Sequence, residues 1–300
     1  MHRFLLFALL AVSLAACKPA EPQNDPNQEE WISLFNGVNL DGWDIKISGH
    51  ELNDNYLNTF LVEDSMIRIS YVNYDSFGDN YGHMYYKEPY SYYKLEFDYR
   101  FVGQQTPGGA VWNNRNSGVM LHSQSAASND FDQDFPVSVE LQLLGGLGQG
   151  ERPTANVCTP GTAVVMKDTV DFTHCINSTS KTYDGDQWVH AEAVVLGDES
   201  ITHIVEGDTV LVFYKPQIGG GFISKTRGPD WANFGITHPE PWIEKEGTTL
   251  KEGYIALQAE SHPIDFRHIR LLDLCGCMDK KAKNYKAYYV KDAPEKCVYE

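Results

Sequence analysis

The strongest constraint on the fold is a repeated alternation of apolar and polar residues that runs from Trp31 to Leu274. The alternating runs are short, and Gly, Asn, Asp or Pro separates them about every ten residues. Residues 92–101, 137–143 and 188–195 alternate most clearly, as strands with one buried face do. No segment carries the 3.6-residue periodicity of a long helix. The pattern therefore predicts an all-β sandwich.

Two further segments predict how the strands are connected. Residues 201–205 and 209–213 predict a hairpin, because an Asp/Gly turn separates the two runs. Residues 230–252 combine prolines and glycines with acidic side chains, which predicts a long loop.

The N-terminus has the order of residues found in a bacterial secretory signal. Arg3 precedes an apolar run over residues 4–12, and Leu-Ala-Ala-Cys follows at 14–17. This ending matches the bacterial lipobox, so residues 1–16 are expected to be a signal peptide, with Cys17 carrying fatty acyl chains such as palmitate. The alternative is an ordinary cleaved signal with an incidental cysteine. Lys18 stands where an Asp commonly retains a lipoprotein on the inner membrane, so we expect an exported lipoprotein anchored in the outer membrane.

The composition limits the partners of the mature chain. Residues 17–30 are rich in Pro, Asn and Glu and predict a flexible tether. The chain has 24 Lys and Arg against 41 Asp and Glu, and loss of Arg3 with the signal leaves 23 against 41, a net charge of −18. Such a surface repels nucleic acid, so no nucleic-acid partner is expected.

Cysteine usage predicts two disulfides. One of the six cysteines is the lipidated Cys17, and an odd number remains in an oxidising compartment; these are Cys158, Cys175, Cys275, Cys277 and Cys297. Cys158 and Cys175 flank one apparent hairpin and are predicted to pair. Cys297 then pairs with Cys277 or with Cys275, of which we choose Cys277.

Residues 275–300 form a separate C-terminal module, too small to fold without its disulfide. The alternative use of these cysteines, a zinc site, is disfavoured because no CxxC motif is matched by a second CxxC or by HxxxH. No metal or cofactor is therefore predicted.

Seven segments carry a resemblance to a known family. They are 34–46 (LFNGVNLDGWDIK), 58–71 (NTFLVEDSMIRISY), 116–122 (NSGVMLH), 134–146 (DFPVSVELQLLGG), 158–162 (CTPGT), 174–188 (HCINSTSKTYDGDQW) and 253–272 (GYIALQAESHPIDFRHIRLL). On these segments the chain resembles the 3-keto-disaccharide hydrolase domain family over nearly all of residues 31–274. The resemblance implies a concanavalin-like jelly roll, whose edges sometimes carry a structural divalent ion, so such an ion is a further possibility here.

The resemblance also implies a reaction on sugars that a separate sugar 3-oxidoreductase has oxidised to a ketone at carbon 3. The ketone acidifies the hydrogen on carbon 2, so a base can remove it, and the substituent on carbon 1 then leaves by elimination. Water can add to the product. Such a site needs a base, an acid for the leaving oxygen and donors facing the enolate oxygen.

Strand alternation proposes the residues for these roles. Val139 and Leu141 occupy the core face of their strand, so Glu140 and Gln142 share the other face. By the same argument Ile255 and Leu257 face the core, so Gln258 and Glu260 share the opposite face. His262 and Arg267 follow closely in the sequence and complete this second polar set. The alternatives are a solvent-exposed outer face for the first set and a bulge with a structural Glu–Arg ion pair for the second.

We expect Glu140 or Glu260 to be the base or the acid, His122 or His262 to be the complementary group, and Arg267 to support the carboxylates or the oxyanion. Further residues are expected to bind substrate: Gln142, Gln258 and Asn116 through sugar hydroxyls, Lys46 through an enolate or hydroxyl oxygen, and Trp43 and Trp112 by stacking. The structural alternatives are a surface histidine at position 122, a solvated lysine and two core tryptophans.

Two other functions stay open from the sequence. A concanavalin-like fold often only binds glycans, so the domain could be a lectin-like module. A conventional retaining glycosidase would need two carboxyl groups about 5 Å apart, which Glu140 and Glu260 could supply. In every case we expect an oligosaccharide or glycoside ligand and a membrane contact through the lipid anchor.

Overall fold

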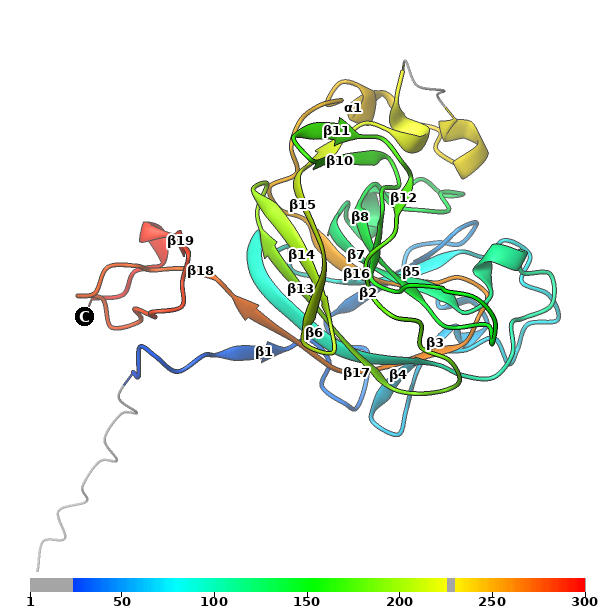
Figure 1. Cartoon of the computed structure of the whole chain (residues 1–300), viewed down its shortest axis with the longest axis horizontal. Coiled ribbons are helices and arrows are strands. Elements are labelled where there is room, and N and C mark those ends of the chain that lie inside the picture. The colour runs from blue at the N-terminus through cyan, green and yellow to red at the C-terminus, as the bar shows by residue number, and fades with distance from the viewer. Residues whose placement is uncertain (1–23, 226–229, 300) are drawn as a thin grey trace, which may run out of the picture.

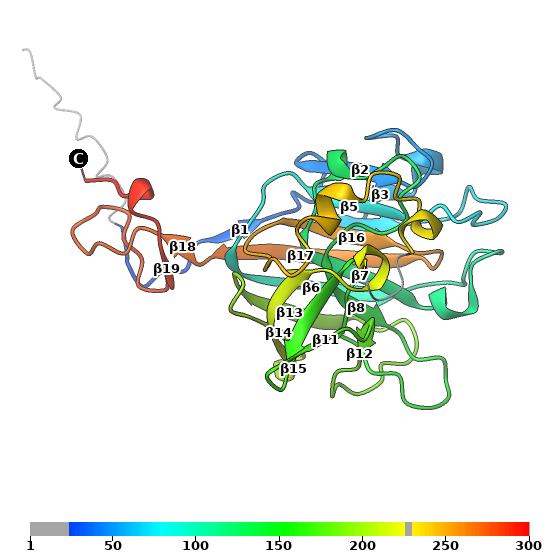
Figure 2. The same ribbon diagram turned by 90° about the horizontal axis from the view of Figure 1, so that it is seen from above.

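The computed structural model describes residues 24–225 and 230–299, and these form two antiparallel sheets packed face to face (Figures 1 and 2). The larger sheet has ten strands. In spatial order they are β11 (Thr169–Asp171), β10 (Thr162–Met166), β15 (Asp208–Ile218), β14 (Ser200–Val205), β13 (Val189–Leu196), β6 (Tyr92–Phe101), β17 (Ile264–Asp273), β4 (Met66–Ile69) and β3 (Phe60–Glu63), with β1 (Trp31–Ser33) also paired to β17.

The smaller sheet has seven strands and carries the candidate site. In spatial order they are β12 (Cys175–Ile176), β9 (Asn156–Cys158), β8 (Val139–Leu144), β7 (Asn116–Ser123), β16 (Tyr254–Ala259), β5 (Gly82–Tyr86) and β2 (Trp43–Ile47). Short helices lie in the connections: η1 (Tyr56–Asn58), η2 (Val111–Asn113), η3 (Ala126–Ser128), η4 (Gly221–Ile223), η5 (Trp231–Phe234), α1 (Glu240–Ile243) and η6 (Pro294–Lys296). The predicted all-β sandwich with a jelly-roll architecture is confirmed.

The core lies between the two sheets, where the predicted alternation places it. In β6 every second side chain is buried, and β13 packs beside it in the same alternation. The predicted hairpin is present as β14 and β15, and both Glu206 and Gly207 adopt positive φ at its turn. Residues 230–252 contain only short helical turns among the described residues, as expected for a long loop.

The chain crosses from the smaller sheet to the larger one immediately after Glu260. Strand β16 ends at Ala259, and β17 begins at Ile264 in the opposite sheet. Residues that are close in sequence here therefore lie in different layers of the sandwich.

Asp265 joins three strands of the larger sheet on the face away from the core. Its side chain is fully buried, although it is charged. It accepts hydrogen bonds from Arg68 Nε (2.6 Å) and Nη2 (2.9 Å) in β4 and from Arg100 Nε (2.9 Å) in β6. Both carboxylate oxygens are thus engaged by guanidinium groups, which compensates the burial of the charge.

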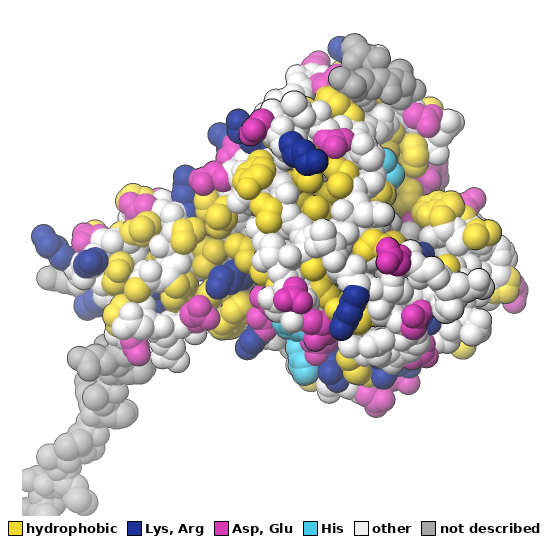
Figure 3. Space-filling model, in the orientation of Figure 1, with side chains coloured by type: hydrophobic (Ala, Val, Ile, Leu, Met, Phe, Trp, Pro, Cys, Tyr) yellow, Lys and Arg dark blue, Asp and Glu magenta, His cyan; other side chains and the backbone are white. Residues whose placement is uncertain are grey.

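The C-terminal module projects from one end of the sandwich (Figures 1 and 3). Its strands β18 (Cys275–Gly276) and β19 (Lys291–Asp292) pair in parallel, and the Cys277–Cys297 disulfide closes it. The Cys158–Cys175 disulfide joins β9 to β12. Both predicted disulfides are confirmed, and Cys275 is the free thiol among the described cysteines.

Part of the expected tether lies against the module. The Asn24 side chain donates to the carbonyls of Lys283 and Tyr285, and Lys286 Nζ lies 2.5 Å from a Glu30 carboxylate oxygen. Residues 24–30 are therefore held by the module. The predicted signal peptide and Cys17 lie outside the described residues.

No helix in the described part of the chain has the length and apolar character needed to span a membrane.

We expect Asp265→Asn to destabilise the domain by about 3 kcal/mol, toward the lower end for a broken buried ion pair because both arginines are partly exposed. The measurement is urea unfolding, in which the midpoint should fall with little change in the slope. Glu63→Gln is the matched control, because exposed Glu63 pairs with the same Arg68. It should cost less than about 1 kcal/mol. Equal losses in the two variants would contradict the role of Asp265.

Candidate functional site

The candidate site lies on the face of the smaller sheet that points away from the core. Glu140 on β8 is level with Met120 on β7, and Met120 is level with Ala256 on β16. The next level contains Gln142, Gly118 and, on the neighbouring strands, Gln258 opposite His83. The predicted alternation of β8 and β16 is therefore correct: Leu141 and Leu257 enter the core, and the glutamates and glutamines point the other way.

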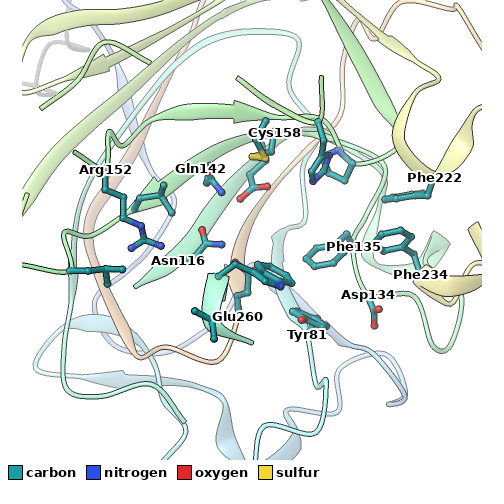
Figure 4. Close-up of a pocket in the computed structure, with 18 residues that line it drawn as sticks. Tyr81, Asn116, Asp134, Phe135, Gln142, Arg152, Cys158, Phe222, Phe234 and Glu260 are labelled. Carbon is teal, nitrogen blue, oxygen red and sulfur yellow. A yellow bond between two sulfur atoms is a disulfide. The ribbon is translucent and has the colours of Figure 1, made fainter. Parts of the chain in front are cut away.

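A cavity of about 720 Å³ opens on this face (Figure 4). Its polar lining consists of Asn116, Asp134, Glu140, Gln142, Arg152, His174 and Glu260. Its other lining residues are Tyr81, Val111, Trp112, Phe135, Leu144, Leu147, Cys158, Pro160, Cys175, Phe222 and Phe234. The volume lies within the range of small-molecule sites.

Glu140 and Glu260 both line the cavity although their residues are only 6% and 3% exposed. Burial raises the pKa of the Glu140 carboxyl, because the protein solvates the charged form less well than water does. Burial also raises the pKa of Glu260, and the nearby Glu140 charge adds to this shift. The two carboxyls therefore resist simultaneous ionisation and hold a proton above the usual carboxyl range.

Gly118 makes room for the Glu140 carboxylate. A Cβ atom on Gly118 would overlap the Glu140 side chain, whose Cγ would lie 2.7 Å away. The glycine sits on β7, between β8, which carries Glu140, and β16, which ends one residue before Glu260. The Glu140 carboxylate occupies the position that a side chain on this residue would need.

Several buried acceptor atoms on this face have no hydrogen-bond partner within the described structure. They are Asn116 Oδ1, Gln258 Oε1 and Glu260 Oε2. Gln142 differs, because its Oε1 accepts from Asn156 Nδ2 at 3.0 Å. Unpartnered buried acceptors are costly in a folded protein, and a ligand that carries hydroxyl groups would satisfy them.

Arg152 supplies the positive charge of the cavity lining. Its Nη1 donates to the carbonyls of Arg115 (3.0 Å) and Gly145 (2.5 Å), which fixes the guanidinium at the cavity wall. Burial lowers the pKa of Arg152, neighbouring Arg115 lowers it further, and Glu260 opposes both effects. Arg152 thus lies close enough to Glu260 for their charges to interact.

The structure brings five predicted site residues to the cavity, namely Glu140, Glu260, Gln142, Asn116 and Trp112. Trp112 on η2 is 55% exposed, and its ring stacks with that of Tyr81 at 6.3 Å between centroids. Gln258 belongs to the same face but is not part of the cavity lining.

The two predicted histidines are buried outside the cavity lining. His122 Nε2 lies 3.0 Å from the Gly197 carbonyl, and burial lowers its pKa to about 4. His262 stands edge-on to Phe101, neither ring nitrogen has a partner among the described residues, and burial lowers its pKa to about 4. Both rings are therefore neutral near pH 7.

Arg267 lies in the opposite sheet, so the structure does not bring it to the glutamates. The chain changes sheets between Glu260 and Ile264, and Arg267 then points to the outer face of the larger sheet. There its Nε donates to Asp98 at 3.0 Å, and the guanidinium covers the Trp188 ring at 3.9 Å. Proximity in sequence predicts that residues following β16 lie beside it, and this prediction is wrong for Arg267 because the chain changes sheets.

Lys46 and Trp43 have structural contacts in place of the expected substrate contacts. Lys46 Nζ donates to the carbonyls of Ile47, His50 and Phe131 within 2.9 Å, so its donors are used. Trp43 is buried in the core and donates from Nε1 to the Leu34 carbonyl at 2.8 Å. Neither residue lines the cavity.

Sequence reasoning missed Arg152, Asp134 and the phenylalanines of the cavity. Arg152 follows a glycine-rich segment, 145–150, that has no strand periodicity. Phe222 and Phe234 come from the long connection between β15 and β16, where alternation predicts nothing. A basic residue two positions after a glycine-rich segment was the available signal.

Among residues 24–225 and 230–299, no three His, Cys, Asp or Glu side chains gather in a way that could hold a metal ion.

We expect Glu260→Gln to stabilise the protein more at pH 8 than at pH 5. The raised pKa of Glu260 means that the folded chain holds this proton more tightly than the unfolded chain does. The stabilisation that this proton gives the wild-type protein is fully present below the pKa of a glutamate in the unfolded chain, about 4.3. It is lost as the pH rises through the pKa of Glu260 in the folded protein. Glutamine stays neutral throughout.

The measurement is the difference in melting temperature between variant and wild type across this pH range. Glu252→Gln, at an exposed position outside the cavity, is the control and should give a constant difference. A difference for Glu260→Gln that falls with rising pH would contradict the raised pKa.

Several solved structures are similar to this chain. A candidate glycosyl hydrolase from Parabacteroides distasonis is 16% identical, with 81% of this chain and 93% of that chain covered and a TM-score of 0.45. The carbohydrate-binding module CBM66 from Bacillus subtilis is 10% identical, with 77% and 95% covered and a TM-score of 0.42. LamAcat from Zobellia galactanivorans is 6% identical, with 76% and 90% covered and a TM-score of 0.41.

The family comparison covers the sandwich from end to end. No curated protein matches the chain in sequence. Residues 30–272, which run from just before β1 to the last residues of β17, match the model of one family. This confirms the resemblance drawn from the seven sequence segments: the chain belongs to the family of the 3-keto-alpha-glucoside-1,2-lyase-like domain.

Proposed function

We propose that the protein cleaves the glycosidic bond of 3-keto-glycosides by removing the proton on carbon 2 and eliminating the substituent on carbon 1. The observation that carries this proposal is the pair of buried glutamates, Glu140 and Glu260, which line one cavity with raised pKa values. The two carboxyls hold protons above the usual carboxyl range, and in the state with one shared proton one glutamate is ionised and the other is protonated. The pair can therefore supply a base and an acid at the same time.

In the first step the ionised glutamate takes the proton from carbon 2. The electron pair of the broken C–H bond forms a double bond between carbons 2 and 3, and the ketone oxygen becomes an enolate oxygen. The neighbouring ketone makes this hydrogen acidic, which is why an ordinary sugar would not react in the same way. A carboxylate with a raised pKa is a stronger base than an exposed one.

In the second step the enolate reforms the ketone, and a double bond forms between carbons 1 and 2. The bond from carbon 1 to the glycosidic oxygen breaks, and its electron pair goes to the leaving oxygen. The protonated glutamate gives its proton to that oxygen. Water can then add across the new double bond, with hydroxyl at carbon 1 and hydrogen at carbon 2, which makes the overall reaction a hydrolysis.

Arg152 is the residue that we propose to face the enolate oxygen. It is the arginine in the cavity lining, and two backbone carbonyls hold its guanidinium in place. A fixed positive charge stabilises the enolate without having to reorganise during the reaction. In this role it replaces Arg267, which lies on the far face of the other sheet.

The proposed reaction is redox-neutral, and its proton transfers are assigned to side chains of this chain, so it consumes no redox cofactor. The ketone itself must come from elsewhere. The protein would depend on a separate sugar 3-oxidoreductase that supplies 3-keto-glycosides.

We expect the purified protein to cleave a 3-keto-disaccharide and to leave the unoxidised parent disaccharide intact, because only the ketone acidifies carbon 2. The measurement is the release of the two sugars followed by chromatography. Cleavage of the parent would indicate a conventional glycosidase. Binding of the sugars without any turnover would indicate a lectin-like module.

The two glutamates provide the matched variants for this assay. Glu140→Gln and Glu260→Gln should each lower kcat by about 100-fold or more, the usual contribution of a general acid or base. Glu252→Gln should keep wild-type kcat, because this exposed residue lies outside the cavity. With a 4-nitrophenyl leaving group the variant that lacks the acid should recover activity. Full activity in both cavity variants would contradict the assigned roles.

We also propose that Cys17 carries a lipid and holds the exported domain at the outer membrane. The lipobox at residues 14–17 supports this anchor. Residues 24–30, which lead toward Cys17, lie against the C-terminal module. Residues 275–300 contain six lysines and four acidic residues, a net charge of +2 in a chain of −17, and Lys and Arg side chains gather at the free end of the projection (Figure 3). A basic module at this end suits an anionic membrane surface.

We expect bacteria fed with labelled palmitate to label the wild-type protein but not Cys17→Ser. The variant should also move from the membrane fraction to the soluble fraction after export, because its anchor is lost. Cys275→Ser is the control and should remain labelled, since Cys275 lies within the folded C-terminal module. Retention of the label by Cys17→Ser would refute this anchor.

A further inference from the structure

The cavity has two chemically different ends (Figure 4). Asn116, Gln142, Arg152 and Glu260 lie together at one end, on or beside the central strands of the smaller sheet. Phe135, Phe222 and Phe234 lie together at the other end. A ligand that fills the cavity therefore meets hydrogen-bonding groups on one side and aromatic rings on the other.

The aromatic end is a continuous wall. The Phe222 and Phe234 rings are 4.8 Å apart between centroids, and Phe234 stands edge-on to Phe135 at 6.1 Å. Phe135 is in turn 4.8 Å from Tyr81, whose ring stacks with that of Trp112. These five residues form the aromatic wall.

Backbone contacts fix the wall in position. The Asp134 amide donates to the Phe234 carbonyl at 3.1 Å, which ties the loop that carries Phe234 to the segment that carries Phe135. Gly235 lies so close to the Asp132 carbonyl that any Cβ atom would overlap it. The wall is therefore preformed, and a ligand that packs on it does not have to order it first.

Two polar groups at the wall already have partners. The Tyr81 hydroxyl accepts from Asn113 Nδ2 at 3.1 Å, and Asp134 Oδ1 accepts from the Ser48 hydroxyl at 2.9 Å. A second sugar ring placed here would bring several hydroxyl groups into contact with phenylalanine rings, and an unpaired buried hydroxyl is costly. An apolar ring would meet no such cost.

We infer that the aromatic wall binds the group that leaves from carbon 1, and that this group is an apolar ring, aromatic or alicyclic, in preference to a second sugar. This inference rests on the proposed function, since it places the 3-keto sugar at the glutamates. The substrates it selects are 3-keto-glycosides of apolar alcohols and phenols. The hydroxyl-bearing ring stays at the polar end, where Asn116 Oδ1 and Glu260 Oε2 have no partners in the part of the chain that the structure describes.

The test compares a cyclohexyl 3-keto-glucoside with a 3-keto-disaccharide of the same anomeric configuration. A sugar is at least as good a leaving group as cyclohexanol, so a preference for the cyclohexyl compound reports binding at the wall. Wild type should show the higher kcat/KM for the cyclohexyl compound. Phe234→Ala should lower that kcat/KM by about tenfold, mainly through KM, and change the value for the disaccharide little.

Phe131→Ala is the matched control, because Phe131 is exposed and lies outside the cavity lining, and it should leave both values unchanged. A wild-type preference for the disaccharide, or equal losses on both substrates in Phe234→Ala, would overturn the inference. A failure of the proposed chemistry is seen separately. If neither 3-keto substrate is cleaved, calorimetry can measure the affinities for the unoxidised cyclohexyl glucoside and the parent disaccharide. Equal affinities would overturn the inferred preference for an apolar ring.

Discussion

The site depends on one constraint, which is that the central strands of the smaller sheet are buried on both faces. All eight residues of β7 are buried, and on the side that faces away from the core Glu140 of β8 and Ala256 and Gln258 of β16 are buried as well. Polar side chains at these positions lose water whether or not they find partners. The raised pKa values of Glu140 and Glu260 and the unpartnered amide oxygens of Asn116 and Gln258 are consequences of this enclosure.

Neighbouring features maintain that enclosure without neutralising the carboxyl pair. The Cys158–Cys175 disulfide closes the edge beside Glu140, since Cys158 is level with Glu140 in the sheet. Gly118 lets the Glu140 carboxylate pack directly against the backbone of β7. Neither offers a charge or a hydrogen bond to the carboxyls. The two glutamates can therefore gain and lose a proton. Asp265 in the other sheet differs, because it is buried between two arginines that stabilise its ionised form.

Alternation in the sequence was sufficient to predict the sandwich and the orientation of Glu140, Gln142 and Glu260. When every second side chain of a strand enters the core, the side chains between them must point to the opposite face. It could not predict Arg152 or the phenylalanines, since these come from connections whose path depends on long-range packing. Arg267 failed for a related reason. Residues 253–272 contain two strands in opposite sheets, and the turn between them reverses the layer to which a side chain belongs.

The charge balance of the proposed reaction explains why a buried acid pair is compatible with turnover. One glutamate gains a proton and the other loses one, so the pair ends with the same total charge as before. The number of ionised carboxylates in the cavity therefore does not increase. The charge that does develop is on the enolate oxygen, and Arg152 is the fixed cation in the cavity lining. A neutral ketone suits this arrangement. An anionic sugar would place a further negative charge beside a pair whose own repulsion already raises the pKa of Glu260.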